Sequence, residues 1–114
     1  MPTSRALCVR TRLGVERMPR DASRSRTIRR RVVVRGRVQG VFFRDTCRRE
    51  ARFRGVTGWV RNAADGSVEA AFEGDLASVE ALIDWSHRGP EGADVTAVEV
   101  VEEPPQGETR FRVI

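Results

Sequence analysis

Lysine is absent from this chain of 114 residues, and cysteine and histidine are scarce. Two cysteines, Cys8 and Cys47, are too few for a disulfide framework. With a single histidine they cannot complete a four-ligand zinc site without carboxylates, and no metal-ligand spacing is present. No apolar run approaches the roughly 20 residues of a membrane-spanning helix. Residues 1–12 also lack the apolar segment of a secretory signal. We therefore expect a cytoplasmic location with reduced thiols, no membrane partner and no metal.

All positive charge comes from arginine: 21 arginines stand against 16 acidic residues, for a net charge of +5. Such a balance suggests a nucleic-acid partner. The charge is unevenly distributed, however. Residues 1–31 hold ten arginines and two acids, a net +8, whereas residues 32–114 hold eleven arginines and fourteen acids, a net −3. The chain is therefore interpreted as a basic arm followed by a mildly acidic body.

The first 27 residues show no sustained hydrophobic period and are interrupted by proline and serine. They bury too little apolar surface to offset their ordering entropy, so residues 1–27 are predicted to be a disordered, arginine-rich extension. Three roles stay open: an extension without function, since Met18 would serve equally well as a start, a polyanion-binding segment or a transit peptide. The first is favoured because the arm has no aromatic residue to stack on bases.

The body shows alternating strand and helix patterns. The β-branched run around Val33 predicts a strand. Apolar residues at i, i+4 and i+8 predict the helix that follows it. Asp75 is a suitable N-cap for a second helix, which Gly89-Pro90 would end. Strands are predicted at residues 30–37, 56–62, 67–73, 94–103 and 109–114, and helices at residues 43–54 and from residue 76 to the Gly89-Pro90 pair.

This order, β-α-β-β-α-β-β, predicts one α+β domain over residues 28–114. Two helices that each follow a strand at similar spacing suggest a split βαβ pair. The predicted architecture is a ferredoxin-like α/β sandwich, with an antiparallel sheet and both helices on one of its faces.

The segment between the first predicted strand and helix is Gly36-Arg37-Val38-Gln39-Gly40-Val41-Phe42-Phe43-Arg44. Glycines let several backbone N–H groups point into one concavity, and a helix start adds unpaired N–H groups and a favourable dipole for an anion. Arg44 lies in the first turn, where its guanidinium can meet two phosphate oxygens. The same residues are compatible with an ordinary turn that carries a surface arginine, because the Lys-Ser/Thr ending of the ATPase phosphate loop is missing.

A second motif, Gly58-Trp59-Val60-Arg61-Asn62, ends the second predicted strand just before an Asp65-Gly66 turn signal. In a ferredoxin-like sandwich this edge lies beside the loop that follows the first strand. Asn62 can therefore project its carboxamide toward that loop and hold a water, since an amide both donates and accepts hydrogen bonds. The alternative is an ordinary turn asparagine.

These two motifs, followed by Asp65-Gly66-Ser67-Val68-Glu69, resemble the acylphosphatase family over roughly residues 30–114. The resemblance implies the ferredoxin-like fold and hydrolysis of acyl phosphates, the mixed anhydrides of a carboxylate and phosphate. It implies two catalytic residues: Arg44 binds the phosphate and Asn62 orients the attacking water. The implied phosphate-binding loop acts through backbone N–H groups and comprises Val38, Gln39, Gly40, Val41, Phe42 and Phe43.

The chemistry expected from this resemblance needs no metal or cofactor. Carboxylate is a good leaving group, so a strong general acid is unnecessary. The motifs accordingly contain no histidine, cysteine or lysine. Cys47, Trp59 and Trp85 are expected to serve in packing, and His87 is expected on the surface near a helix end. The acids Glu99, Glu102 and Glu103 are expected to form a solvated strand face.

The expected partner is a small-molecule acyl phosphate, which the sequence does not identify further, and the protein is expected to be a monomer. Two other functions stay open. One is a nucleic-acid-binding ferredoxin-like module that uses the arginine-rich residues 1–31, which the net negative body and an aromatic content of 6% disfavour. The other is a non-catalytic phosphate-binding relative, which the intact Arg44 and Asn62 disfavour.

Overall fold

The computed structural model describes residues 26–114, so nearly all of the predicted disordered extension lies outside the described residues. The predicted element order is confirmed, and every boundary lies within two residues of its predicted position. The elements are β1 (Ile28–Arg37), α2 (Phe43–Phe53), β2 (Thr57–Asn62), β3 (Val68–Gly74), α3 (Leu76–Arg88), β4 (Asp94–Glu103) and β5 (Phe111–Val113). In this part of the chain no helix is long and apolar enough to cross a membrane.

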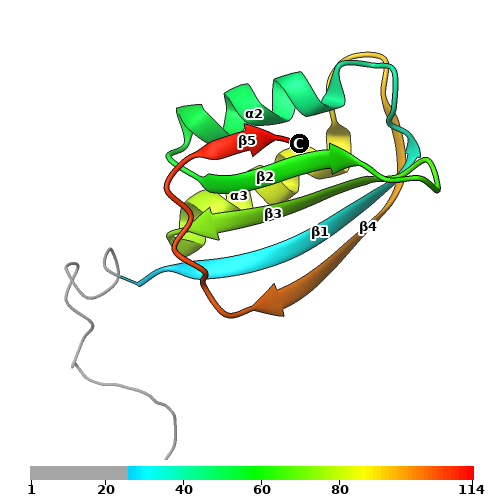
Figure 1. Cartoon of the computed structure of the whole chain (residues 1–114). Helices are drawn as coiled ribbons and strands as arrows, with labels where there is room; N and C mark the ends of the chain where they lie inside the picture. Colours follow the sequence, from blue (N-terminus) through cyan, green and yellow to red (C-terminus); the bar gives the residue numbers. More distant parts are fainter. Residues whose placement is uncertain (1–25) are drawn as a thin grey trace, which may run out of the picture.

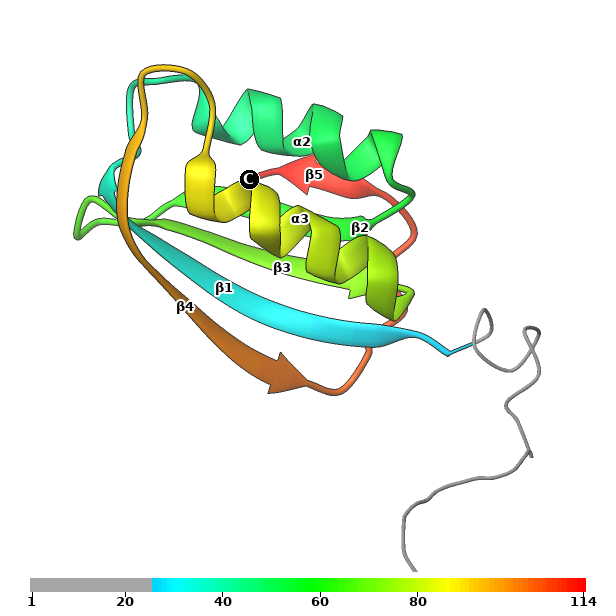
Figure 2. The ribbon, with the colours of Figure 1, turned by 180° about the vertical axis from the view of Figure 1, so that it is seen from behind.

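The strands form one five-stranded sheet in the order β4-β1-β3-β2-β5, and both helices cover the same face of it (Figure 1). The fold is the predicted ferredoxin-like sandwich, but the prediction of a fully antiparallel sheet is wrong. β5 pairs with β2 in parallel, with Gly58 opposite Phe111. β4 ends at one end of the sheet, and the segment 104–110 crosses along that end to the far edge (Figure 2). β5 therefore starts beside the start of β2 and must run in the same direction.

The core lies between the helices and the sheet and has the predicted apolar stripes. On α2 the buried residues are Phe43, Cys47 and Ala51, as their spacing predicts. The ring of Phe43 packs against Trp85 of α3, with 5.2 Å between the ring centroids. This contact joins the two helices at the end of the sheet where α2 begins. Burial of these side chains fixes the position of the first turn of α2, which carries Arg44.

The opposite face of the sheet carries a network of arginine–glutamate ion pairs. Strand alternation places Arg29, Arg31 and Arg35 of β1 on this face, because Val32 and Val34 face the helices. Arg29 is only 2% exposed and donates to Glu73, which is 3% exposed, with 3.0 Å between Nη1 and Oε1. Further pairs join Arg29 to Glu103 and Glu108, Arg31 to Glu69 and Glu103, Arg61 to Glu69, and Arg35 to Glu99 and Asp65.

This network corrects two interpretations of the sequence. Residues 29–31 were counted with the basic arm, but they belong to β1 and pair with carboxylates of the domain. Glu103 was expected on a solvated face, but it is half-buried between Arg29 and Arg31. When charge is counted from the first strand, residues 28–114 hold fourteen arginines and fourteen acids and are neutral. The whole excess of +5 therefore falls on residues 1–27, with seven arginines and two acids.

Candidate active site

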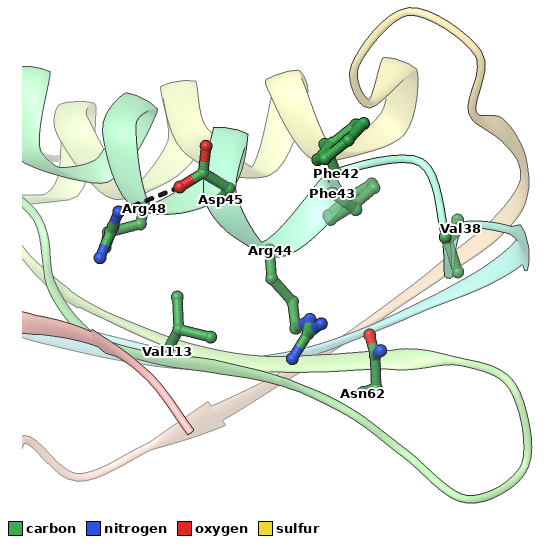
Figure 3. Close-up of a pocket in the computed structure, with 9 residues that line it drawn as sticks. Val38, Phe42, Phe43, Arg44, Asp45, Arg48, Asn62 and Val113 are labelled. Atoms are coloured by element: carbon green, nitrogen blue, oxygen red, sulfur yellow. Dashed lines mark hydrogen bonds and ion pairs between the residues drawn. The ribbon is translucent and has the colours of Figure 1, made fainter.

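The loop between β1 and α2, the start of α2 and the ends of β2 and β5 enclose a pocket of about 390 Å³. Both residues predicted to be catalytic line it, although they come from different elements. Figure 3 shows Arg44 extending from α2 and Asn62 rising from β2, so that their side chains point toward one another. The lining residues are Val38, Gly40, Phe42, Phe43, Arg44, Asp45, Arg48, Asn62 and Val113.

Arg44 is held by its helix while its side chain is left available. It lies in the first turn of α2 and is exposed. Among residues 26–114 its side chain takes part in no ion pair and no hydrogen bond, whereas most arginines of the sheet face are paired with carboxylates. A guanidinium group presents five N–H donors in a planar fork that matches phosphate or carboxylate oxygens. Arg44 can therefore give its donors to a bound anion without breaking an existing contact.

The backbone of the loop turns sharply ahead of α2. Gly40 has φ +77°, and Phe42, the residue before the helix, has φ 62° and ψ 28° in the left-handed region. A non-glycine residue in this region is strained by roughly 1–3 kcal/mol, and such strain clusters at functional sites. This conformation was not predicted, because nothing in the sequence of the segment requires a positive φ at Phe42, whose side chain is 80% exposed.

Several backbone N–H groups of this loop have no hydrogen-bond acceptor in the part of the chain that the structure describes. Within the described residues the backbone N–H groups of Gln39 to Phe42 donate to no backbone or side-chain oxygen. The first intrahelical bond is donated by the N–H of Thr46 to the carbonyl oxygen of Phe42, at 3.0 Å. The N–H groups of the first turn therefore also lack intrahelical acceptors. Together these donors and the positive end of the helix dipole favour an anion at this place.

Of the predicted loop residues, Gln39 and Val41 do not line the pocket. Val41 is half-buried and packs against the core. The side chain of Gln39 instead connects the loop to the β2–β3 hairpin: its Nε2 donates to the carbonyl oxygens of Ala63 and Ser67, at 2.8 and 2.9 Å. Since Ala63 directly follows Asn62, this contact fixes the loop next to the asparagine.

The turn beyond Asn62 lies at the predicted Asp65-Gly66 pair, with Gly66 at φ +93°, and the side chain of Asp65 holds it. Oδ1 of Asp65 accepts hydrogen bonds from the hydroxyl and the backbone N–H of Ser67, at 2.6 and 3.0 Å. Arg35 donates to the other carboxylate oxygen. The hydrogen bonds from Ser67, together with that from Arg35, lower the pKa of Asp65 to about 2. The turn is therefore charged and closed at neutral pH, and the end of β2 has a fixed position.

Two residues that line the pocket, Asp45 and Arg48, were not predicted from the sequence. Asp45, in the first turn of α2, accepts from Arg48 Nη2 at 3.0 Å and from Arg49 Nη2 at 3.3 Å. Arg48 follows Arg44 by four residues, and residues four apart share one face of a helix. That spacing of four residues was the feature of the sequence that could have placed Arg48 beside Arg44.

The other candidate groups lie away from this chemistry. Cys47 is fully buried, and burial raises the pKa of its thiol far above its ordinary value, so it packs in the core as expected. His87 is exposed at the end of α3, with Nδ1 3.0 Å from the carbonyl oxygen of Ile83. Trp85 is buried in the core, whereas the half-buried Trp59 lies under the guanidinium of Arg31. No three acidic, histidine or cysteine residues between 26 and 114 are placed to hold a metal ion.

Comparison with known proteins identifies the family. The sequence model of the acylphosphatase family matches residues 30–113. The chain belongs to the acylphosphatase family. It is 56% identical over 88 residues to an acylphosphatase of Rubrobacter xylanophilus, covering 77% of this chain and 80% of that protein. It is 55% identical over 87 residues to an acylphosphatase of Thermococcus kodakarensis, covering 76% of this chain and 96% of that protein.

A solved structure gives the same result for the fold. The structure of an acylphosphatase from Coxiella burnetii superposes with a TM-score of 0.76 at 37% identity, covering 79% of this chain and 95% of the other. The resemblance drawn from the two motifs is thus confirmed. The protein is a hydrolase of the acylphosphatase family, which acts on small acyl phosphates.

Proposed function

We propose that this protein hydrolyses acyl phosphates by in-line attack of a water molecule on phosphorus, without a metal ion or a cofactor. Arg44 and the backbone N–H groups of residues 38–43 hold the phosphate, and Asn62 orients the water. One observation carries the proposal: Arg44 and Asn62 point toward one another across a pocket bordered by unpaired N–H groups.

Binding of the phosphate uses a preformed loop and an arginine whose side-chain donors are free among residues 26–114. The guanidinium fork of Arg44 donates to two phosphate oxygens, and the loop N–H groups donate to the others. Because the loop N–H groups are already oriented by the fold, little reorganisation of the backbone is needed when negative charge builds up in the transition state. Catalysis is then positioning plus electrostatic stabilisation, as in other phosphoryl transfers.

The bond changes follow from the position of Asn62 opposite Arg44. The carboxamide oxygen of Asn62 accepts a hydrogen bond from the water, and this bond directs a lone pair of the water oxygen at phosphorus. The new bond from water oxygen to phosphorus forms as the bond from phosphorus to the acyl oxygen breaks. The electron pair leaves with the carboxylate, and the protons of the water remain on inorganic phosphate. No general acid is needed, because the leaving carboxylate is weakly basic.

The same proposal covers the rest of the chain. We infer that the catalytic domain comprises residues 28–114, since β1 begins at Ile28 and the family match begins at residue 30. Residues 1–27 would then be an extension outside it. Most arginines of the sheet face are paired with carboxylates and are therefore not free to bind nucleic-acid phosphates. If the protein binds nucleic acid, the extension would have to do so. A monomer in the cytoplasm is the proposed state, and light scattering of the purified chain tests the monomer.

A phosphate-release assay with acetyl phosphate tests the roles of the two side chains. Arg44→Ala removes a donor used in both the ground state and the transition state, so KM rises and kcat falls, with a loss of roughly 10²–10³ in kcat/KM. Asn62→Ala lowers kcat by a similar factor while inhibition by inorganic phosphate is retained. Arg49→Ala is the matched control, because Arg49 lies on the same helix but does not line the pocket.

Two results would contradict the proposal. Near-normal turnover by Asn62→Ala would remove the asparagine from the mechanism. Loss of activity with EDTA that added metal restores would overturn the metal-independent reaction.

A further inference from the structure

We propose that Arg48 binds an anionic group at the far end of the acyl part of the substrate. The pocket would then favour acyl phosphates that carry a second negative charge over those with neutral acyl groups. This inference rests on the proposed function, since it takes the phosphate to lie at Arg44.

The position of Arg48 separates it from the phosphate site within one pocket. It lies four residues after Arg44 on α2, a rise of about 6 Å along the helix. In Figure 3, Arg44 extends toward Asn62, whereas Arg48 lies at the other end of the pocket with Val113 between the two arginines. A substrate whose phosphate is held at Arg44 would therefore direct its acyl group over Val113 toward Arg48.

The size and lining of the pocket leave room for that acyl group. Its volume of about 390 Å³ is in the range of pockets that hold a whole small molecule rather than a single phosphate. The walls near the phosphate include Val38 and Phe43, and Val113 lines the pocket as well. Apolar walls of this kind suit the carbon chain or ring of an acyl group, and the arginine at the end suits a charge.

The donors of Arg48 are mostly unused. Its Nη2 donates to Asp45 Oδ1 at 3.0 Å, and its side chain remains 38% exposed. Its Nε is buried and has no hydrogen-bond partner among residues 26–114. A buried donor without an acceptor is unfavourable, so an anion that draws the guanidinium toward itself can satisfy donors that the protein does not.

Asp45 does not cancel the positive charge at this end. Its carboxylate is shared between Arg48 and Arg49, whose Nη2 lies 3.3 Å from Oδ2. Two guanidinium groups thus share one carboxylate, and a net positive charge remains beside the pocket. Both a carboxylate and a phosphate present the paired oxygens that a guanidinium fork binds.

Rigid acyl phosphates test this inference. We would compare kcat/KM for 4-carboxybenzoyl phosphate with that for the neutral 4-carbamoylbenzoyl phosphate. In both probes the ring keeps the substituent away from the reacting anhydride. The wild type is expected to prefer the charged probe by about fivefold to tenfold. Arg48→Gln is expected to reduce this preference to about one. Raising the ionic strength should weaken the preference of the wild type.

The ratio of kcat/KM for the two probes separates charge recognition by Arg48 from a general loss of activity, because any change at the phosphate site affects both probes equally. Arg49→Gln is the matched control, because it removes the same charge and a partner of Asp45 but does not line the pocket. It lowers the net positive charge beside the pocket, so its ratio should fall only part of the way and stay clearly above that of Arg48→Gln; equal ratios in the two variants would overturn a direct contact with Arg48. A third probe, 4-phosphonobenzoyl phosphate, identifies the preferred anion. If its kcat/KM exceeds that of the carboxy probe, the preferred group is phosphate-like; if its kcat/KM is lower, the preferred group is a carboxylate.

Equal ratios in the wild type and Arg48→Gln would overturn the inference and leave the proposed function standing. Hydrolysis of none of the probes by the wild type would overturn both.

Discussion

Gln39 donates a hydrogen bond from Nε2 to the carbonyl oxygen of Ala63, at 2.8 Å, across 24 residues of sequence. One end of this contact lies in the loop that precedes α2, and the other directly follows Asn62. The contact therefore couples the two segments that together make the pocket. A second bond from the same Nε2 to Ser67 extends the connection to the start of β3.

Replacing Gln39 by alanine should loosen the loop relative to Asn62. The carbonyl oxygens of Ala63 and Ser67 each lose one of two donors and keep a backbone N–H, so two hydrogen bonds are lost and the free energy of unfolding should fall by about 1–2 kcal/mol. Misplacement of the loop should also lower kcat/KM for acetyl phosphate by about tenfold, because small displacements of positioned groups are costly. Urea unfolding and the phosphate-release assay measure the two effects.

Gln106→Ala is the matched control for Gln39→Ala. Gln106 is exposed and contacts Glu73 only through its backbone N–H, which alanine keeps. It should change neither quantity. If Gln39→Ala loses stability but keeps full kcat/KM, the coupling of the two segments has no role in catalysis.

The strained backbone at Phe42 predicts a substitution that stabilises the protein. Glycine adopts a φ of 62° without the steric cost that phenylalanine has, and the 80% exposed side chain contributes little burial. Phe42→Gly should raise the free energy of unfolding by about 0.5–1 kcal/mol in urea unfolding. Phe53→Gly is the control: Phe53 is 87% exposed and ends α2 with a helical backbone, so there glycine relieves no strain and should destabilise by about 0.5 kcal/mol. Destabilisation by both substitutions would show that Phe42 is not strained.

Acid stability should depend on Glu73. Burial alone would raise the pKa of this carboxyl, but hydrogen bonds from the backbone of residues 106–108 and from Arg29 outweigh burial, and its pKa is lowered. The unfolded state then binds the proton at a higher pH than the folded state does. The stabilisation from Glu73 is therefore complete above its unfolded pKa of about 4.3 and is lost as the pH falls through the lower folded pKa.

Glu73→Gln tests this dependence. At pH 7 the variant should be less stable by about 3 kcal/mol, because Arg29 is left buried with one partner fewer. Between pH 5 and pH 3, roughly the range around the unfolded pKa, it should lose less stability than the wild type. Urea unfolding at several pH values gives both curves. Parallel curves for the two proteins would show that Glu73 does not contribute to acid unfolding.

The sequence predicted most of the fold because its signals are local. The spacing of Phe43, Cys47 and Ala51 identifies the buried face of α2, and the Asp65-Gly66 turn separates β2 from β3. The direction of β5 could not be predicted in the same way. Three residues of strand have no pattern that distinguishes parallel from antiparallel pairing, and the outcome depends on where β4 ends.

The site was predicted in part for a similar reason. Arg44 and Asn62 were found from motifs, and the structure brings both to one pocket. The left-handed backbone at Phe42 was not predicted, because it results from the path of the loop between two fixed elements rather than from the preference of phenylalanine. The contribution of Arg29 to the interior was missed for another reason: its charge suggested solvent, but strand alternation and the segment 104–110 bury it against Glu73.

The ion pairs of the sheet face and the pocket are made by arginine in a chain without lysine. An acyl phosphate is an electrophile that transfers its acyl group to amines, and the neutral ε-amino group of a lysine is such a nucleophile. A guanidinium group stays protonated with its charge delocalised, so it does not compete for the acyl group. The cations that hold this domain together and line its pocket are thus chemically inert toward the reactive compounds on which its family acts.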